Sequence, residues 1–174
     1  MYYRELIKRS AELYKKNEAD SISLSVSVFQ TGAQWMQQMM KQMDEDTPDL
    51  DPAISFSKYG TLKYTLCLLA FFVSAFLFYK INRWLLPLSV LIFYMVEIQF
   101  LFLFPVLISR LPNPVSKSIQ MTFETGTMKA IFTVIPIAAF MLTGLFNLRN
   151  PYRNWHIGSL AILIWYSDEV KNRN

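Results

Sequence analysis

The longest apolar stretch of the chain extends from Thr61 to Ile108, and one short basic segment interrupts it. The interruption, Lys80 to Arg83, leaves about 20 or more apolar positions on each side, enough for a helix to cross a ~30 Å hydrocarbon core. The pattern therefore predicts a transmembrane helical hairpin. We expect spans over residues 61–79 and 84–108, joined by a tight basic turn.

Two more apolar runs follow the hairpin. Residues 128–148 predict a third span, which Pro136 should kink without preventing insertion. Residues 155–167 are short for a span, but Trp155 and the pair Trp165–Tyr166 bracket them as interfacial aromatic side chains do. We interpret this run as a short fourth span, with a re-entrant segment as the alternative.

Residues 1–43 predict two helices that precede the spans. The first covers about 15 residues and has its apolar side chains on one face. Residues 21–28 alternate as a strand would, but the chain offers no second strand pattern to pair with them. Heptad spacing instead favours a helix from about Ser21 to Met43, with a seam formed by Ile22, Val26, Phe29, Ala33, Met36, Met40 and Met43.

This methionine-rich seam is an adaptable apolar surface. It could close on the first helix, on a second copy of the chain, or on another protein, and we prefer another protein. The fold class we expect is an all-α integral membrane protein, with three to four transmembrane helices preceded by a cytoplasmic amphipathic helical hairpin. Its parts are the hairpin over 1–43, an acidic proline-containing linker over 44–60, the transmembrane bundle over 61–168 and a polar tail over 169–174.

The linker is expected neither to continue the second helix nor to pack, because it carries two prolines among its acidic residues. Calcium binding is not expected there, since the acidic stretch over residues 44–52 has no glycine to form an EF-hand turn.

The net charge of +4 does not alter the prediction of a membrane protein. Basic residues lie at the ends of the apolar runs and aromatic residues lie inside them, so we expect membrane lipids as partners and no nucleic acid. The distribution of basic residues around four spans favours a cytoplasmic N-terminus in a plasma or inner membrane or its equivalent. The first residues lack the apolar stretch of a signal peptide, so insertion is expected to depend on the internal hairpin.

Glu97 is the only formal charge deep inside a predicted span. A carboxylate there is costly unless it is protonated, paired or hydrated. We expect no Lys or Arg at its depth, so Ser74, Thr133 or Thr143 would be its partner, with Gln99 nearby on the same helix. Glu97 would then serve as a polar contact to a partner helix, or as a proton or cation site.

A second polar cluster lies at one predicted membrane boundary, between the third and fourth apolar runs. Arginine pairs well with phosphate and histidine can transfer a proton, so the cluster predicts contact with a lipid headgroup or phosphate through Arg149, Arg153, Asn154 and His156. The chain has one histidine and one cysteine, Cys67, which we interpret as a small apolar core residue. We expect no metal and no cofactor.

None of the common nucleotide-binding, hydrolase or metalloprotease motifs occurs in the chain. We therefore predict a non-catalytic integral membrane subunit that assembles with other chains, docking through Glu97 and the seam; self-association is a further option. The first alternative is a small membrane enzyme, or an enzyme helper, acting on lipid-linked or phosphorylated lipid substrates at the Arg149–His156 boundary. The second is a proton- or cation-coupled transport component that uses Glu97.

Overall fold

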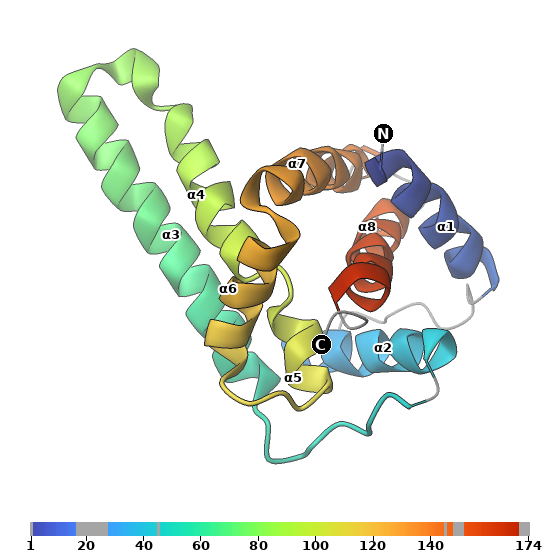
Figure 1. The fold of residues 1–174 in the computed structure, drawn as a ribbon. Coiled ribbons are helices and arrows are strands. Elements are labelled where there is room, and N and C mark those ends of the chain that lie inside the picture. Colours follow the sequence, from blue (N-terminus) through green and yellow to red (C-terminus); the bar gives the residue numbers. More distant parts are fainter. Residues whose placement is uncertain (1, 17–27, 45, 145, 148–151, 171–174) are drawn as a thin grey trace.

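The computed structural model describes residues 2–16, 28–44, 46–144, 146–147 and 152–170, and every regular element among them is helical (Figure 1). The all-α prediction is confirmed. The helices are α1 (Tyr2–Lys16), α2 (Val28–Met43), α3 (Phe56–Ile81), α4 (Leu88–Gln99), α5 (Leu103–Ile108), α6 (Pro114–Thr125), α7 (Thr127–Gly144) and α8 (Arg153–Trp165). A short turn, η2 (Arg83–Leu85), follows α3, and a π-helical turn, η3 (Tyr166–Val170), continues α8.

Three segments are long and apolar enough to cross a membrane: Phe56–Ile81, Arg83–Ile108 and Thr127–Gly144. They correspond to the first three predicted spans. The first helix begins five residues earlier than predicted, because the Ser55 hydroxyl accepts a hydrogen bond from the Lys58 amide and caps it. The earlier start places Lys63 two turns inside α3 and not at its flank.

The predicted fourth span is a different kind of element. The 13 residues of α8 extend roughly 20 Å, which is short of the ~30 Å hydrocarbon core. Nearly every position from His156 to Trp165 is buried, and Figure 1 shows α8 enclosed by α1, α2 and α7. A helix that is apolar all round is typical of a buried element, and α8 is too short to be among the three candidate spans.

Helices α3 and α4 form the predicted hairpin and extend away from the rest of the molecule (Figure 1). Only a narrow stripe of α3 is buried, formed by Phe56, Gly60, Lys63, Cys67 and Ser74. The spacing of this stripe is that of a helix packing seam. Large apolar side chains cover the remaining surface, including Leu69, Phe72 and Phe76, which are about half exposed or more. An apolar surface of this size is typical of a segment that contacts either a membrane or another protein.

The second arm is broken, although its sequence predicted one continuous span. Helix α4 ends at Gln99 and α5 begins at Leu103. The ring of Pro105 removes the amide that would have bonded to the Leu101 carbonyl. Hydroxyls of α6 satisfy two carbonyls at the break: Ser118 donates to Gln99 at 3.2 Å and Thr122 donates to Ile98 at 3.3 Å. Such side-chain donors are what allow a helix to break at membrane depth.

The two N-terminal helices pack around α8 (Figure 1). Helix α1 buries Leu6, Ser10 and Tyr14 on its predicted apolar face. The seam of α2 is filled from within the chain by α3, α5 and α8. Ala33 and Met40 are buried, while Phe29, Met36 and Met43 are half-buried. Ile22 and Val26 lie outside the described residues.

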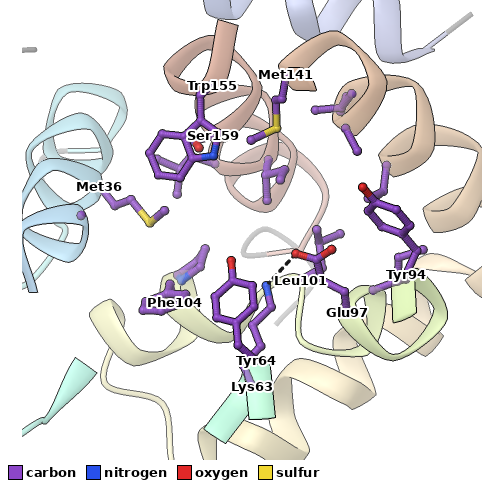
Figure 2. Close-up of a pocket in the computed structure, with 18 of the residues that line it drawn as sticks. Met36, Lys63, Tyr64, Tyr94, Glu97, Leu101, Phe104, Met141, Trp155 and Ser159 are labelled. Carbon is purple, nitrogen blue, oxygen red and sulfur yellow. Dashed lines mark ion pairs between the residues drawn. The ribbon is translucent and has the colours of Figure 1, made fainter. Parts of the chain in front are cut away.

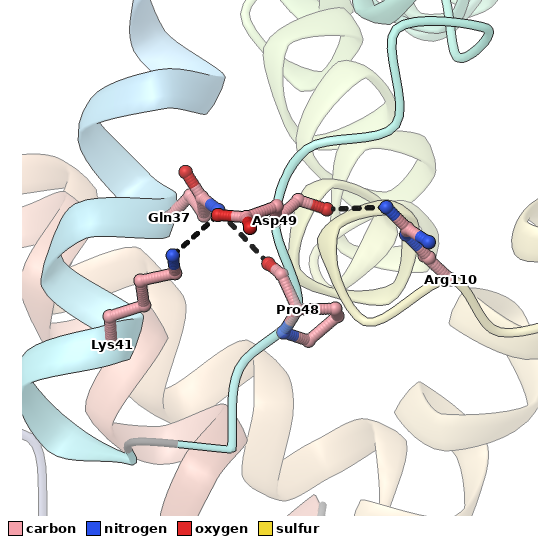
Figure 3. A network of polar contacts seen from close by, with 5 residues as sticks. All are labelled: Gln37, Lys41, Pro48, Asp49 and Arg110. Atoms are coloured by element: carbon pink, nitrogen blue, oxygen red, sulfur yellow. Dashed lines mark hydrogen bonds and ion pairs between the residues drawn. The ribbon is translucent and has the colours of Figure 1, made fainter.

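The acidic linker packs against its neighbours, so the prediction that it would not pack is wrong. Gln37 on α2 donates to the Pro48 carbonyl at 3.0 Å, and Lys41 pairs with the Asp49 carboxylate (Figure 3). Arg110, just after α5, donates to the Asp49 carbonyl at 2.9 Å. The hydrogen bond from Lys41 holds the pKa of the Asp49 carboxyl below its usual value. These contacts hold the segment that precedes α3 against α2 and the end of α5.

Candidate functional site

A cavity of about 530 Å³ lies where α2, α3, α4, α5, α7 and α8 meet (Figure 2). Its volume falls within the range of roughly 300–1,000 Å³ typical of small-molecule sites. The lining is mainly aromatic, aliphatic and thioether side chains, among them Phe29, Met36, Tyr64, Phe93, Tyr94, Leu101, Phe104, Ile137, Met141, Trp155 and Leu163. Because its walls come from segments far apart in sequence, the cavity is a product of the tertiary fold.

One ion pair lines this cavity. The Lys63 Nζ atom lies 3.5 Å from Glu97 Oε1, and the two side chains are 10% and 24% exposed. The prediction that Glu97 would have no counter-charge in its own chain is wrong. Because α3 begins at Phe56, Lys63 is inside the helix, and the antiparallel hairpin brings it beside the end of α4. The pairing offsets part of the cost of burying either charge.

Helix α2 closes over this region through Phe29. A Cβ atom on Gly60 would lie 2.5 Å from the Phe29 ring, so only glycine permits this close approach. The Phe29 ring stacks on the rings of Tyr64 and Phe104, with centroid distances of 5.9 Å and 6.2 Å. Aromatic contacts thus hold α2, α3 and α5 together around the cavity.

Few polar groups face the otherwise apolar space. In Figure 2 the Lys63 and Glu97 side chains point toward each other, with Tyr64 and Tyr94 on either side. Ser159 and Trp155 lie on α8, across the cavity from the pair. An apolar cavity with a few convergent polar groups can bind a small molecule and orient it. Met36 and Met141 lie on facing walls, and thioethers adapt readily to the shape of a ligand.

The other polar residues expected near Glu97 lie in separate environments. Gln99 does not line the cavity, and its buried Oε1 atom has no hydrogen-bond partner within the described part of the chain. Ser74 donates to the Phe71 carbonyl and Thr143 to the Phe140 carbonyl, each on its own helix. Neither hydroxyl is the partner of Glu97.

The predicted headgroup cluster is not assembled as one site among the described residues. Arg149 lies outside them, and Arg153 is half-buried at the start of α8. Asn154 donates to the Phe140 carbonyl of α7 at 3.2 Å, which turns its amide toward the protein. Contact of Arg149 and Arg153 with a headgroup stays a prediction.

His156 is directed toward the N-terminal helices. It is 4% exposed. Its ring stacks on Tyr14 with the ring centroids 5.9 Å apart, and it makes an edge contact with Trp35 with the centroids 5.2 Å apart. Its Nδ1 atom donates to the Tyr152 carbonyl at 2.8 Å, which leaves Nε2 as the unprotonated nitrogen of the neutral ring. Burial lowers the pKa of His156, so the neutral form is favoured. The His156 ring is therefore a buried group of the protein core.

Metal ligands are not clustered in the described residues: no group of three or more His, Cys, Asp or Glu side chains there could hold an ion. Cys67 is buried on the α3 stripe, one turn from Lys63.

The sequence analysis missed Lys63, Tyr64, Tyr94, Trp155 and Ser159 as residues of a site. A signal for Lys63 was present, because Gly60, Lys63 and Cys67 fall on one helical face and small residues mark helix contacts in membranes. No comparable signal marks the others, since they meet only in the folded chain.

Comparison of the chain with protein-family models, with curated proteins and with solved structures found no match.

Proposed function

We propose that this chain is an integral membrane protein that binds a lipid-soluble small molecule in the cavity beside Lys63 and Glu97. The observation that carries the proposal is the combination of the two features. A cavity of about 530 Å³ with an apolar lining suits a drug-sized apolar body, and the ion pair supplies the polar contacts that orient it.

The ion pair itself supports a ligand role. Replacing a buried pair with apolar residues of similar volume is often neutral or stabilising, so stability alone gives little reason for Lys and Glu at these positions. Their polar atoms face a cavity and not a packed interface. A bound molecule that uses these atoms accounts for the arrangement.

The structure weakens the grounds for the subunit hypothesis. Both features that were expected to need another protein have partners inside the chain: Glu97 pairs with Lys63, and the described seam of α2 packs on α3, α5 and α8. Assembly with other membrane chains now rests on the exposed apolar surface of α3, which lipid would cover equally well. The enzyme alternative loses support because Asn154 and His156 face different neighbours.

Gly32 provides the test of cavity binding. It lines the cavity, and a Cβ atom there would meet nothing within 4 Å, so Gly32→Phe should fill the space without a clash. Gln34→Phe adds the same ring to the exposed face of the same helix and is the matched control.

Native mass spectrometry of the protein extracted in mild detergent compares the three proteins. Retained small-molecule mass in wild type and Gln34→Phe, with loss in Gly32→Phe, is the expected result. Equal retention in all three would contradict cavity binding. Retention of additional polypeptides in all three, with no small-molecule difference, would favour the subunit hypothesis instead.

A further inference from the structure

We infer that the ligand is an electrically neutral, lipid-soluble molecule with a hydroxyl group, which hydrogen-bonds to Lys63 and Glu97 together. This inference rests on the proposed function and names the class of ligand that the same cavity would take.

The charge of the site excludes an ionic headgroup. Lys63 and Glu97 are the only formally charged side chains among the lining residues, and they neutralise each other at 3.5 Å. A carboxylate or an ammonium group brought into this apolar space would be a third, uncompensated charge. Removing such a charge from water costs far more than removing a neutral hydroxyl that finds partners.

The hydrogen-bonding capacity of the pair favours a hydroxyl group. An ammonium group has three donors and a carboxylate has two acceptor oxygens, so one contact between Nζ and Oε1 leaves capacity on both sides. A hydroxyl oxygen can accept from Lys63 while its hydrogen is donated to Glu97. An ether or ketone can use only the donor of Lys63, and a hydrocarbon can use neither.

The walls of the cavity place weaker constraints on the apolar body of the ligand. Phe29, Phe104 and Trp155 offer aromatic faces, and the thioethers of Met36 and Met141 can adjust to different apolar bodies. The polar group is therefore the feature that the cavity discriminates. Tyr64 and Tyr94 flank the pair and also line the cavity.

A set of probes with one apolar body tests this inference. We would use 12-bromododecan-1-ol, its methyl ether, 12-bromododecanoate, 12-bromododecylamine and 1-bromododecane, each at a known mole fraction in phosphatidylcholine nanodiscs. Bromine quenches tryptophan fluorescence at short range, and Trp155 lines the cavity. The difference between wild type and Trp155→Phe isolates Trp155 from the other tryptophans.

The alcohol is expected to half-saturate the Trp155 quenching at a concentration at least about 10-fold lower than any other probe, since hydrogen bonds to charged groups are the stronger ones. Lys63→Met combined with Glu97→Met should raise the half-saturation concentration of the alcohol to that of the hydrocarbon, and should leave the half-saturation concentration of the hydrocarbon unchanged. Lys41→Met with Asp49→Asn removes an exposed ion pair away from the cavity and should change neither value.

Each other outcome overturns a distinct claim. If the carboxylate or the amine binds as tightly as the alcohol, the ligand class is wrong while cavity binding stands. If the ether half-saturates the quenching at the same concentration as the alcohol, the inferred hydrogen bond from the ligand hydroxyl to Glu97 is wrong. An alcohol preference that survives in the Lys63/Glu97 double variant removes the ion pair from recognition. If no probe quenches Trp155, both this inference and the proposed function fail.

Discussion

Lys63 on α3 and Glu97 on α4 form an ion pair between two candidate membrane-spanning segments, with Nζ and Oε1 3.5 Å apart. Together the two side chains carry no net charge in the buried contact between α3 and α4. The pair also fixes which turn of α3 faces the end of α4, because each charge is stabilised only beside the other.

Removing one member of the pair should cost more than removing both. Glu97→Gln or Lys63→Met leaves one charge uncompensated, and we expect each to destabilise the fold by about 3 kcal/mol. The double variant should lose clearly less than the sum of the two. The midpoint of SDS-induced unfolding in mixed micelles measures this. Additive single effects would show that the two side chains do not interact.

Gly60→Ala should loosen the contact between α2 and α3. The new methyl group would overlap the Phe29 ring, and overpacking of this kind costs about 1–3 kcal/mol. Gly32→Ala, at an open position of α2, is the control and should stabilise the helix by about 0.5–1 kcal/mol. Thermal unfolding of the two variants in detergent compares them. Equal behaviour would contradict the close approach of Phe29 to α3.

Stability should fall as the pH is lowered through about 6.5. The unfolded chain binds a proton on His156 near that pH, whereas burial lowers the pKa of the folded residue, so the folded state gains the proton only at lower pH. The contribution of neutral His156 to the free energy of unfolding is therefore complete above the pKa of the unfolded chain. It is lost as the pH falls toward the lower pKa of the folded protein. Because one proton is involved, the slope has an upper limit of about 1.4 kcal/mol per pH unit.

The control for this pH dependence is His156→Phe, which keeps a ring between Tyr14 and Trp35. The chain has no other histidine, so the variant should show a flatter unfolding midpoint between pH 7 and 5. An unchanged profile would show that another group causes the dependence.

Arg9 on α1 pairs with Asp168 on η3, and both side chains are partly exposed. Because this contact joins the two ends of the described chain, we predict that both ends lie on one side of a membrane, which requires an even number of crossings. Three segments are long enough to cross, but Figure 1 shows α7 lying crosswise to α3 and α4. We therefore predict that the α3–α4 hairpin supplies the two crossings.

Cysteine accessibility tests this topology. In a Cys67→Ser background, Glu5→Cys and a cysteine appended after Asn174 should react with an impermeant maleimide from the same side. Trp84→Cys, in the exposed hairpin turn, should react from the opposite side. Labelling of the two ends from opposite sides would contradict the prediction.

The sequence predicted the apolar segments of the hairpin and of α7, because long apolar runs are a direct signal of segments that could cross a membrane. The same signal predicted a short fourth span at α8, a 13-residue helix that protein covers on nearly all sides. The start of α3 was predicted five residues too late because the Ser55 cap was not recognised. The cavity was beyond prediction, as it depends on where six helices meet.

Photolabelling tests the central claim, that the cavity binds a lipid-soluble molecule, most directly. A dodecan-1-ol probe with a diazirine on its chain would be photolysed with the protein in nanodiscs, and its adducts located by peptide mass spectrometry. We predict adducts on cavity residues such as Met36, Met141 and Leu163, which Gly32→Phe abolishes. Adducts confined to the exposed residues Phe72 and Phe76 on α3, and unchanged by Gly32→Phe, would contradict the account.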